Sequence, residues 1–375
     1  MQQSRIRGHK LVGSPSHNAS AYPADIAVAL METPVHHNIE MPNVIKKPYV
    51  IFVGDETSPV YTKTGSGIAH WDRESCVGQI RLSPEAANLG LPDMSLEEAI
   101  AAGAKTLVIG IAVVGGAIPS SMRDVIADAL TRGIDVASGT HDRLADDSEF
   151  AAVAAQSGAR ISDVRVPPLG LPVGKGVKRL GKRLLTVGTD CALGKKYTAL
   201  ALAKEMTARG IDATFRATGQ TGILISGGGV PIDAVVADFV SGAAETLSPD
   251  APGTHWDVIE GQGAILHPGY AAVSMGLLMG SQPDAIVVCT DATRETLVGW
   301  PDFALPSIRE IIDLTVRIGS VVNPDIRVVG ISANTSALSE SEREQYLARL
   351  SEDHGVPAVD SVATGVGPIV DVLQK

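Results

Sequence analysis

An apolar strand pattern, a glycine-containing loop and a helix pattern follow one another directly over residues 183–209. The loop reads Gly-Thr-Asp-Cys-Ala-Leu-Gly-Lys-Lys from residue 188, and good helix formers fill residues 199–206. Glycines let backbone N–H groups turn toward an anion, and a helix N-terminus adds unpaired donors and a positive dipole. This order predicts a phosphate-binding loop of the P-loop type. The alternative is a glycine-rich turn with a solvated lysine.

The residue after the first lysine sets the chemistry expected of this loop. A Walker loop has Ser or Thr there, whose hydroxyl binds Mg²⁺, but this chain has Lys196, with Thr198 two residues further on. Two adjacent lysines supply affinity for anions without that metal ligand. We therefore expect a pyrophosphate-bearing ligand such as coenzyme A, and no metal. The expected cofactor-binding residues are Gly188, Thr189, Asp190, Gly194, Lys195, Lys196, Tyr197, Thr198 and, as a reader of an adenine edge after a later strand, Asn334.

Strand and helix patterns alternate along the rest of the chain. Apolar runs predict strands at 49–53, 106–111, 134–137, 183–187, 213–216, 256–260, 285–289 and 326–331. Helical patterns occur at 95–103, 121–132, 147–157, 195–209, 304–319 and 341–353. This alternation, with abundant Ala, Gly and Val, predicts an α/β protein whose C-terminal half is a doubly wound, mainly parallel sheet.

Composition divides the chain of 375 residues into four parts. Residues 1–46 show no sustained period and are expected to be a disordered or loosely docked extension. Residues 47–165 are expected to form a first α/β domain. Residues 166–182 are rich in Pro, Gly and Lys and have the composition of a linker. Residues 183–375 are expected to form the P-loop domain.

Polar residues follow several predicted strands, where the ligand loops of α/β sheets lie. Glu260 ends an apolar strand and precedes Gly-Gln-Gly, so it is a candidate base or metal-binding carboxylate; the alternative is a loop acid that caps a helix. Arg216, Thr218 and Gln220 follow another strand and are candidates for substrate binding. Arg216 could clamp a carboxylate with two hydrogen bonds, or could form a structural ion pair instead.

Three further residues lie after predicted strands. Arg294 could meet a phosphate or the substrate, with an ordinary loop role as the alternative. His141 is a candidate general base, although a lone histidine is more often structural. Arg143, two residues further on, is a candidate partner for a substrate carboxylate.

Charge and cysteine usage narrow the partners and the compartment. A net charge of −11 gains nothing from nucleic-acid phosphates or anionic lipid, so neither is an expected partner. The three cysteines are far apart and form no zinc-binding pattern. An odd cysteine count without a signal-peptide pattern favours the reducing cytoplasm. A mean hydropathy of +0.16 is compatible with a chain that buries surface in a homo-oligomer. The expected partner is a small-molecule substrate.

Several strings together resemble one family, named DgcN, which was long catalogued as a domain of unknown function and includes D-glutamate N-acetyltransferase. They include GTDCALGKKYTALAL, FRATGQTGILISG, WDVIEGQG, HPGYAAVSMGLLMGSQPDA and ISANTSAL, and the match spans about residues 47–372. The segments PYVIFVGDE, WDRESCVGQIRL, GAKTLVIGIA and SGTHDRLAD resemble its Rossmann-like N-terminal domain. The resemblance implies an enzyme that moves an acetyl group from acetyl-CoA to an amino-acid amine, D-glutamate or a related D-amino acid; the acceptor and its chirality stay open.

A remoter resemblance is to dethiobiotin synthetase. The loop at 188–196, the Glu-Gly-Gln-Gly element at 260–263 and Asn334 look like its nucleotide-binding elements. This resemblance implies the alternative function, an ATP- and Mg²⁺-dependent ligase or kinase. Lys196 stands where those enzymes have Thr, which argues against that chemistry.

The acetyltransferase interpretation gives each candidate a role. Lys195, Lys196 and the loop amides would hold the CoA phosphates. Glu260 or Asp190 would be the general base, with His141 as a further candidate. Arg216 or Arg143 would pair with substrate carboxylates, and Arg294 is a further candidate for substrate binding. The remaining alternative is a non-catalytic sensor of a nucleotide or of CoA.

Overall fold

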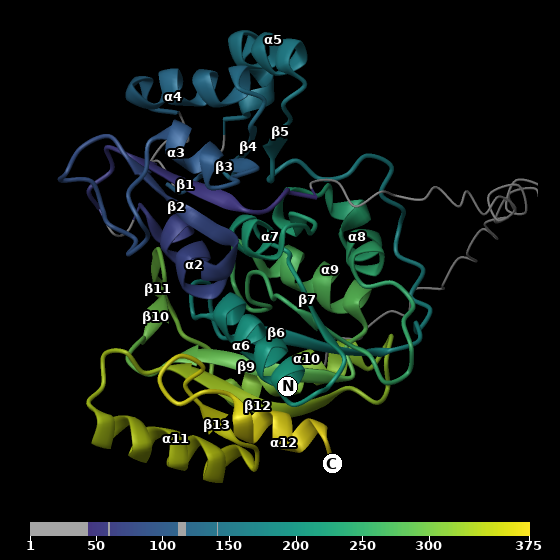
Figure 1. Ribbon diagram of the computed structural model, residues 1–375. Helices are drawn as coiled ribbons and strands as arrows, with labels where there is room; N and C mark the ends of the chain where they lie inside the picture. The colour runs from purple at the N-terminus through teal and green to yellow at the C-terminus, as the bar shows by residue number, and fades with distance from the viewer. Residues whose placement is uncertain (1–43, 59–60, 112–117, 141) are drawn as a thin grey trace, which may run out of the picture. The chain divides into compact units, whose positions relative to one another are not determined.

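The computed structural model describes residues 44–58, 61–111, 118–140 and 142–375. Most of the predicted extension, and the candidate base His141, lie outside these residues. The described chain contains two parallel sheets and one short antiparallel hairpin (Figure 1). The predicted α/β fold class is confirmed.

The first sheet has the order β2-β1-β3-β4-β5, and every neighbouring pair is parallel. Its strands are β1 (Tyr49–Gly54), β2 (Cys76–Arg81), β3 (Thr106–Ile109), β4 (Asp135–Ser138) and β5 (Ile161–Asp163). The helices are α2 (Lys63–Trp71), α3 (Leu96–Ala101), α4 (Ser120–Thr131) and α5 (Ser148–Ser157).

Side chains of β1 alternate between two cores, because successive residues of a strand point to opposite faces. Val50 and Phe52 pack with apolar residues of α3, α4 and α5. Tyr49 and Ile51 pack with α2 and also with Leu200, Ala217 and Ile223 from the C-terminal half. The second face of this sheet is therefore buried against the other half of the chain.

The second sheet has the order β13-β12-β9-β6-β8-β7 and is parallel throughout. Its strands are β6 (Lys182–Gly188), β7 (Ala213–Arg216), β8 (Trp256–Ile259), β9 (Ala285–Asp291), β12 (Arg327–Asn334) and β13 (Ala358–Val359). The hairpin joins β10 (Thr296–Leu297) to β11 (Trp300–Ala304). The chain between β5 and β6 holds neither helix nor strand.

Helices cover both faces of the second sheet, as a doubly wound fold requires. One face packs on apolar residues of α8 (Val240–Leu247), α9 (Ala271–Ser281), α10 (Ile308–Gly319) and α11 (Glu340–His354). The other face packs on α6 (Lys195–Ala208) and α12 (Gly367–Leu373). A further helix, α7 (Gln220–Ser226), packs on α2. Because all strands run in one direction, the loops after them meet at one edge.

Candidate active site

The predicted P-loop connects β6 directly to α6. Gly194 precedes the helix with φ +97°, and Ala192 has φ +52°, so the loop turns through two left-handed residues. At Gly188 a Cβ atom would lie only 3.0 Å from the carbonyl oxygen of Cys289, so glycine allows the loop to pass close to β9. The first N–H groups of α6 have no partner within the helix, so they are available to a ligand at this loop.

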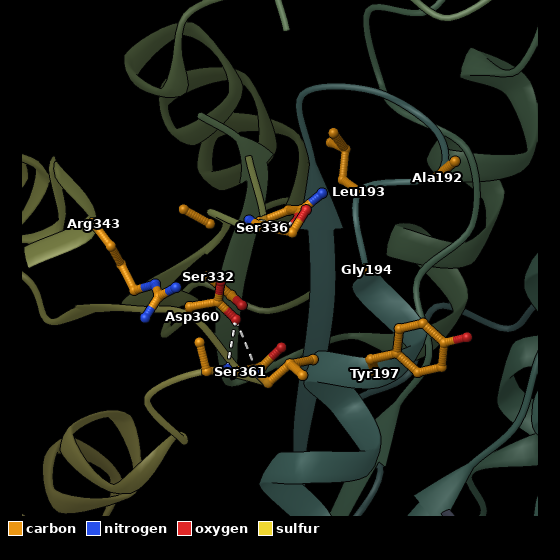
Figure 2. Close-up of a pocket in the computed structure, with 13 residues that line it drawn as sticks. Ala192, Leu193, Gly194, Tyr197, Ser332, Ser336, Arg343, Asp360 and Ser361 are labelled. Atoms are coloured by element: carbon orange, nitrogen blue, oxygen red, sulfur yellow. Dashed lines mark hydrogen bonds between the residues drawn. The ribbon is translucent and has the colours of Figure 1, made fainter. Parts of the chain in front are cut away.

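Two cavities flank this loop and share Ala192, Leu193, Gly194 and Tyr197 as lining residues. The smaller one, of about 330 Å³, is here called the acid cavity, because it adds Glu260 and its following Gly-Gln-Gly to the lysines of the loop. The larger one, of about 460 Å³, is here called the serine cavity (Figure 2). Its further lining residues are Ser332, Ala333, Asn334, Ser336, Arg343, Asp360, Ser361, Val362 and Ala363.

Both lysines of the loop lie at the acid cavity. Nζ of Lys195 donates a hydrogen bond to the carbonyl oxygen of Asp190 at 2.7 Å, and the residue is 7% exposed. Burial lowers the pKa of Lys195 and of Lys196, and for Lys196 the negative charge of Glu260 opposes that effect. The buried ammonium group of Lys195 and the half-buried one of Lys196 lack a carboxylate hydrogen-bond partner within the described chain, which suits them to a ligand anion.

Glu260 is fixed and buried directly after β8. Its Oε2 accepts hydrogen bonds from the backbone N–H groups of Thr218 and Gly219 at 3.0 and 3.1 Å, and the residue is 4% exposed. Burial raises the pKa of Glu260, while Lys196 and the two amides oppose the rise. A buried carboxylate with a raised pKa is a stronger base than an exposed glutamate, as a general base requires.

Thr218 and Gln262 complete the support of Glu260. The hydroxyl of Thr218 donates to the Glu260 carbonyl at 2.7 Å and accepts from Nε2 of Gln262 at 3.0 Å. Thr218 is fully buried and lines neither cavity. The structure thus places this predicted substrate residue behind the carboxylate, where it positions Glu260.

Tyr197 links the P-loop helix to the first sheet's helix α2. Its ring stacks on Trp71 with centroids 5.9 Å apart and an interplanar angle of 12°. An added Cβ at Gly67 would lie 3.2 Å from Thr221 of α7. The N-terminal half therefore packs directly beside the loop that forms both cavities.

The remaining predicted cofactor residues lie deeper. Thr189 is buried, and its hydroxyl lies 3.2 Å from that of Thr290. The hydroxyl of Thr198 lies 2.9 Å from that of Ser332 and donates to Ser361 at 3.2 Å, so Thr198 supports the floor of the serine cavity. Asn334 lines that cavity, and its Nδ2 donates to Asp291 at 2.9 Å.

Asp190 is a structural anion in this fold. It is fully buried, and its Oδ2 accepts from Nη1 of Arg294 and from the backbone N–H of Val298, each at 2.8 Å. Its Oδ1 accepts from the N–H of Cys191 at 2.6 Å. Both oxygens of Asp190 are occupied and it lines neither of the two cavities, so it is not placed to act as the predicted base. The same contacts occupy Arg294, which corrects its predicted role in substrate binding.

Replacing Arg294 with Gln is expected to destabilise the fold by about 2 kcal/mol, because a buried carboxylate loses its charged donor. Arg294 also donates to the carbonyl of Cys191 at 2.7 Å, so the loop loses a second tie. Urea denaturation measures the change. Arg209→Gln, which breaks surface ion pairs with Glu205 and Asp371, is the matched control and should unfold much like the wild type. Equal midpoints for both variants would contradict the structural role.

Two more predicted arginines lie away from the loop. Nε of Arg216 donates to Asp257 at 2.6 Å, which is the structural ion pair that the sequence left open as the alternative. Arg143 is exposed and lines a separate cavity formed with residues 166–171 and Phe239. Gln220 begins α7 and lies so close to Gly139 that an added Cβ there would clash with its Oε1. None of the three lines either cavity beside the P-loop.

His267 is a buried residue near the loop that the sequence reasoning did not select. Its Nε2 lies 3.6 Å from Oδ1 of Asp190 and has no hydrogen-bond partner among the described residues. Asp190, Cys191 and His267 together place potential metal-ligand atoms within 4.8 Å of one another. In the sequence, the one signal that could have pointed to His267 was its place in the string HPGYAAV.

This cluster is poorly suited to a cation. The Nδ1 of His267 accepts a hydrogen bond from Gly269 at 3.1 Å, so the proton of a neutral imidazole sits on Nε2, the nitrogen that would face the metal. The Arg294 guanidinium already lies on Asp190. Burial raises the pKa of Cys191, which disfavours the thiolate that binds metals. We therefore assign the cluster to loop structure.

Fold and site define a two-part α/β protein that joins a Rossmann-like sheet to a P-loop sheet. The chain belongs to the DUF1611 family: its P-loop domain model, described as a domain of unknown function, matches residues 172–370, and the Rossmann-like N-terminal model matches residues 81–167. The resemblance to this family, predicted from the sequence, is confirmed.

Named relatives and a solved structure agree with this membership. A D-glutamate N-acetyltransferase of Tritonibacter scottomollicae is 50% identical over 330 residues, covering 88% of this chain and 99% of the relative. One from a Pseudoalteromonas species is 47% identical, covering 87% and 98%. The crystal structure of a DUF1611 protein from Anabaena variabilis aligns with a TM-score of 0.76 at 32% identity, covering 88% of this chain and all of that one. The chain is an enzyme of the acyltransferase class, an N-acetyltransferase.

Within the residues that the structure describes, no helix is long and apolar enough to cross a membrane.

Proposed function

We propose that this enzyme transfers the acetyl group of acetyl-CoA to the amine of D-glutamate. The observation that carries the proposal is Glu260, a buried carboxylate that shares one cavity with Lys195 and Lys196 of the P-loop. Both named relatives, similar to this chain over almost their whole length, are named D-glutamate N-acetyltransferase, which supports the reaction type and the acceptor. The proposal extends that activity to this chain.

The P-loop would hold the pyrophosphate of CoA. Lys195 gives up its bond to the Asp190 carbonyl and donates to the phosphates, while the first amides of α6 add uncharged donors. The serine cavity and the acid cavity lie on either side of the shared residues 192–194. A ligand held by its phosphates can therefore place its nucleotide in the serine cavity and its thioester in the acid cavity.

Glu260 would remove a proton from the acceptor's ammonium group. The free amine then attacks the thioester carbonyl carbon, the new C–N bond forms, and the C–S bond breaks as the CoA thiolate leaves. The second amine proton passes to that thiolate, so the products are N-acetyl-D-glutamate and CoA. The acid cavity's cations are Lys195 and Lys196, and we assign an acceptor carboxylate to Lys196 because the predicted arginines lie elsewhere.

Incubation of the protein with acetyl-CoA and glutamate tests the proposal. We expect release of free CoA thiol and formation of N-acetylglutamate with the D-isomer, and a much lower rate with the L-isomer. A parallel reaction with ATP and Mg²⁺ measures ADP. Formation of ADP without release of CoA would instead support the ligase or kinase chemistry of dethiobiotin synthetase and reject the proposal.

A further inference from the structure

The serine cavity holds a single cationic residue among those that line it, Arg343 of α11. The acid cavity, on the other side of the P-loop, holds the two lysines and Glu260. The proposed function uses Lys195 for the pyrophosphate, Lys196 for an acceptor carboxylate and Glu260 for proton transfer, and it leaves Arg343 without a role. Arg343 is therefore a cation that lines a cavity beside the phosphate-binding loop and has no function assigned to it.

Two consecutive hydrogen bonds hold the guanidinium of Arg343 at its Nε atom only. Its Nε donates to the hydroxyl of Thr335 at 3.0 Å, and that hydroxyl donates to Oδ2 of Asp360 at 2.5 Å. Nη1 and Nη2 have no hydrogen-bond or ion-pair partner among the described residues, and Figure 2 shows the guanidinium turned toward the space beside Ser332 and Asp360. Two parallel N–H donors therefore face the cavity, as in arginines that bind a phosphate with two hydrogen bonds.

The one carboxylate on this cavity is already occupied. Oδ1 of Asp360 accepts from the N–H groups of Val362 and Ala363 at 2.9 and 3.0 Å, and Oδ2 accepts from the N–H and the hydroxyl of Thr335. Burial disfavours the charge of Asp360, but these hydrogen bonds outweigh it and hold its pKa below the usual value. Asp360 is thus a positioning residue for Arg343, and its charge is offset by four donors.

We infer that Arg343 binds the 3′-phosphate of coenzyme A and so selects CoA over nucleotides that lack this group. The inference rests on the proposed function, in which the nucleotide end of CoA occupies the serine cavity. CoA differs from ADP, ATP and 3′-dephospho-CoA at this end by one phosphate on the ribose. The hydroxyls of Ser332, Ser336 and Ser361 line the same cavity and supply further donors.

Kinetics with two donors test the inference. In wild-type enzyme, kcat/KM for acetyl-CoA should exceed that for acetyl-3′-dephospho-CoA by about 10- to 30-fold, the value of one charged bidentate contact. Arg343→Gln should abolish that preference by lowering kcat/KM for acetyl-CoA alone. Thr335→Val, which removes the tether, should reduce the preference in part. Arg349→Gln is the control, because Arg349 lies on the same helix, is exposed and contacts Tyr346.

The inference would be overturned if Arg343→Gln lowered kcat/KM equally for acetyl-CoA and acetyl-3′-dephospho-CoA. It would also be overturned if the wild type showed no preference between these two acetyl donors. Calorimetric titration with CoA and 3′-dephospho-CoA separates it from the proposed function, because binding needs no turnover. If wild-type protein prefers CoA and Arg343→Gln does not, the inference stands even where no acetylglutamate forms. If neither ligand binds the wild type, the inference is wrong.

Discussion

Glu260→Gln is expected to lower kcat by about 10²- to 10⁴-fold with the fold intact, which is the usual contribution of a general base. The amide oxygen of glutamine can still accept the N–H groups of Thr218 and Gly219, which now lie 3.0 and 3.1 Å from Oε2. The variant therefore loses the proton acceptor and keeps the local hydrogen bonds. Steady-state rates with acetyl-CoA and D-glutamate, together with circular dichroism, measure both effects.

The pH profile gives this prediction a second readout. Burial raises the pKa of Glu260 above its ordinary value, and only the ionised carboxylate can accept a proton. The wild-type kcat should therefore fall as pH decreases through that raised pKa, and the variant's residual rate should lack this step. A profile without such a step in the wild type would assign the base to another group.

The same pKa shift predicts how stability depends on pH. Because the folded-state pKa of Glu260 lies above the unfolded one, the folded protein binds the proton more tightly. The stabilising contribution is complete below the unfolded pKa, near 4.3, and is lost as pH rises through the folded pKa. The Gln variant should gain stability relative to the wild type over that interval.

Glu245→Gln is the matched control for the kinetic effect. Glu245 also accepts hydrogen bonds from two successive backbone N–H groups, those of Lys175 and Gly176, but it lines a different cavity. Its replacement should leave turnover unchanged. Near-wild-type turnover in Glu260→Gln would remove Glu260 from the base role.

The sequence predicted the scaffold of the site because that scaffold is encoded locally. A strand, a glycine-containing loop and a helix in direct succession specify the P-loop at 188–196 without reference to distant residues. The position of Glu260 followed from the same rule, since parallel strands bring their following loops to one edge. Predicting these features required only the periodicity of apolar residues and the order of elements along the chain.

Side-chain partners could not be predicted in this way. Arg216 and Arg294 were expected to face a substrate, but their partners Asp257 and Asp190 lie 41 and 104 residues away along the chain. Arg343 lies on α11, which is strongly polar in sequence, and only the packing of that helix beside β12 and β13 brings it to the serine cavity. Tertiary contacts, which no local sequence pattern records, determine where the side chains of these three arginines lie.

Glycine also concealed one helix from the sequence reasoning, which did not delimit α9. It contains Gly276 and Gly280, and glycine weakens an isolated helix. In the fold they let α9 pack tightly on α8, because a Cβ at Gly276 would lie 2.5 Å from Val240 and one at Gly280 would clash with the Ser241 carbonyl. The close packing of α9 on α8 therefore outweighs the low helix propensity of its glycines.

Lys195→Met is expected to raise the Kd for CoA about 100-fold, because the phosphates lose a charged donor inside a buried loop. The ligand-free variant should be as stable as the wild type, since burial already disfavours the Lys195 ammonium and lowers its pKa. Methionine fills a similar volume. The prediction therefore separates ligand binding from folding.

Thermal unfolding with and without CoA measures the difference. At a CoA concentration of 100 times the wild-type Kd, the ligand should stabilise the wild type by about 2.7 kcal/mol and the variant by only about 0.4 kcal/mol. Lys204→Met is the control, because Lys204 is an exposed lysine of the same helix α6 and should respond to CoA like the wild type. If CoA stabilises Lys195→Met as strongly as the wild type, then Lys195 does not hold the phosphates, and the P-loop binds CoA through its amides or does not bind it at all.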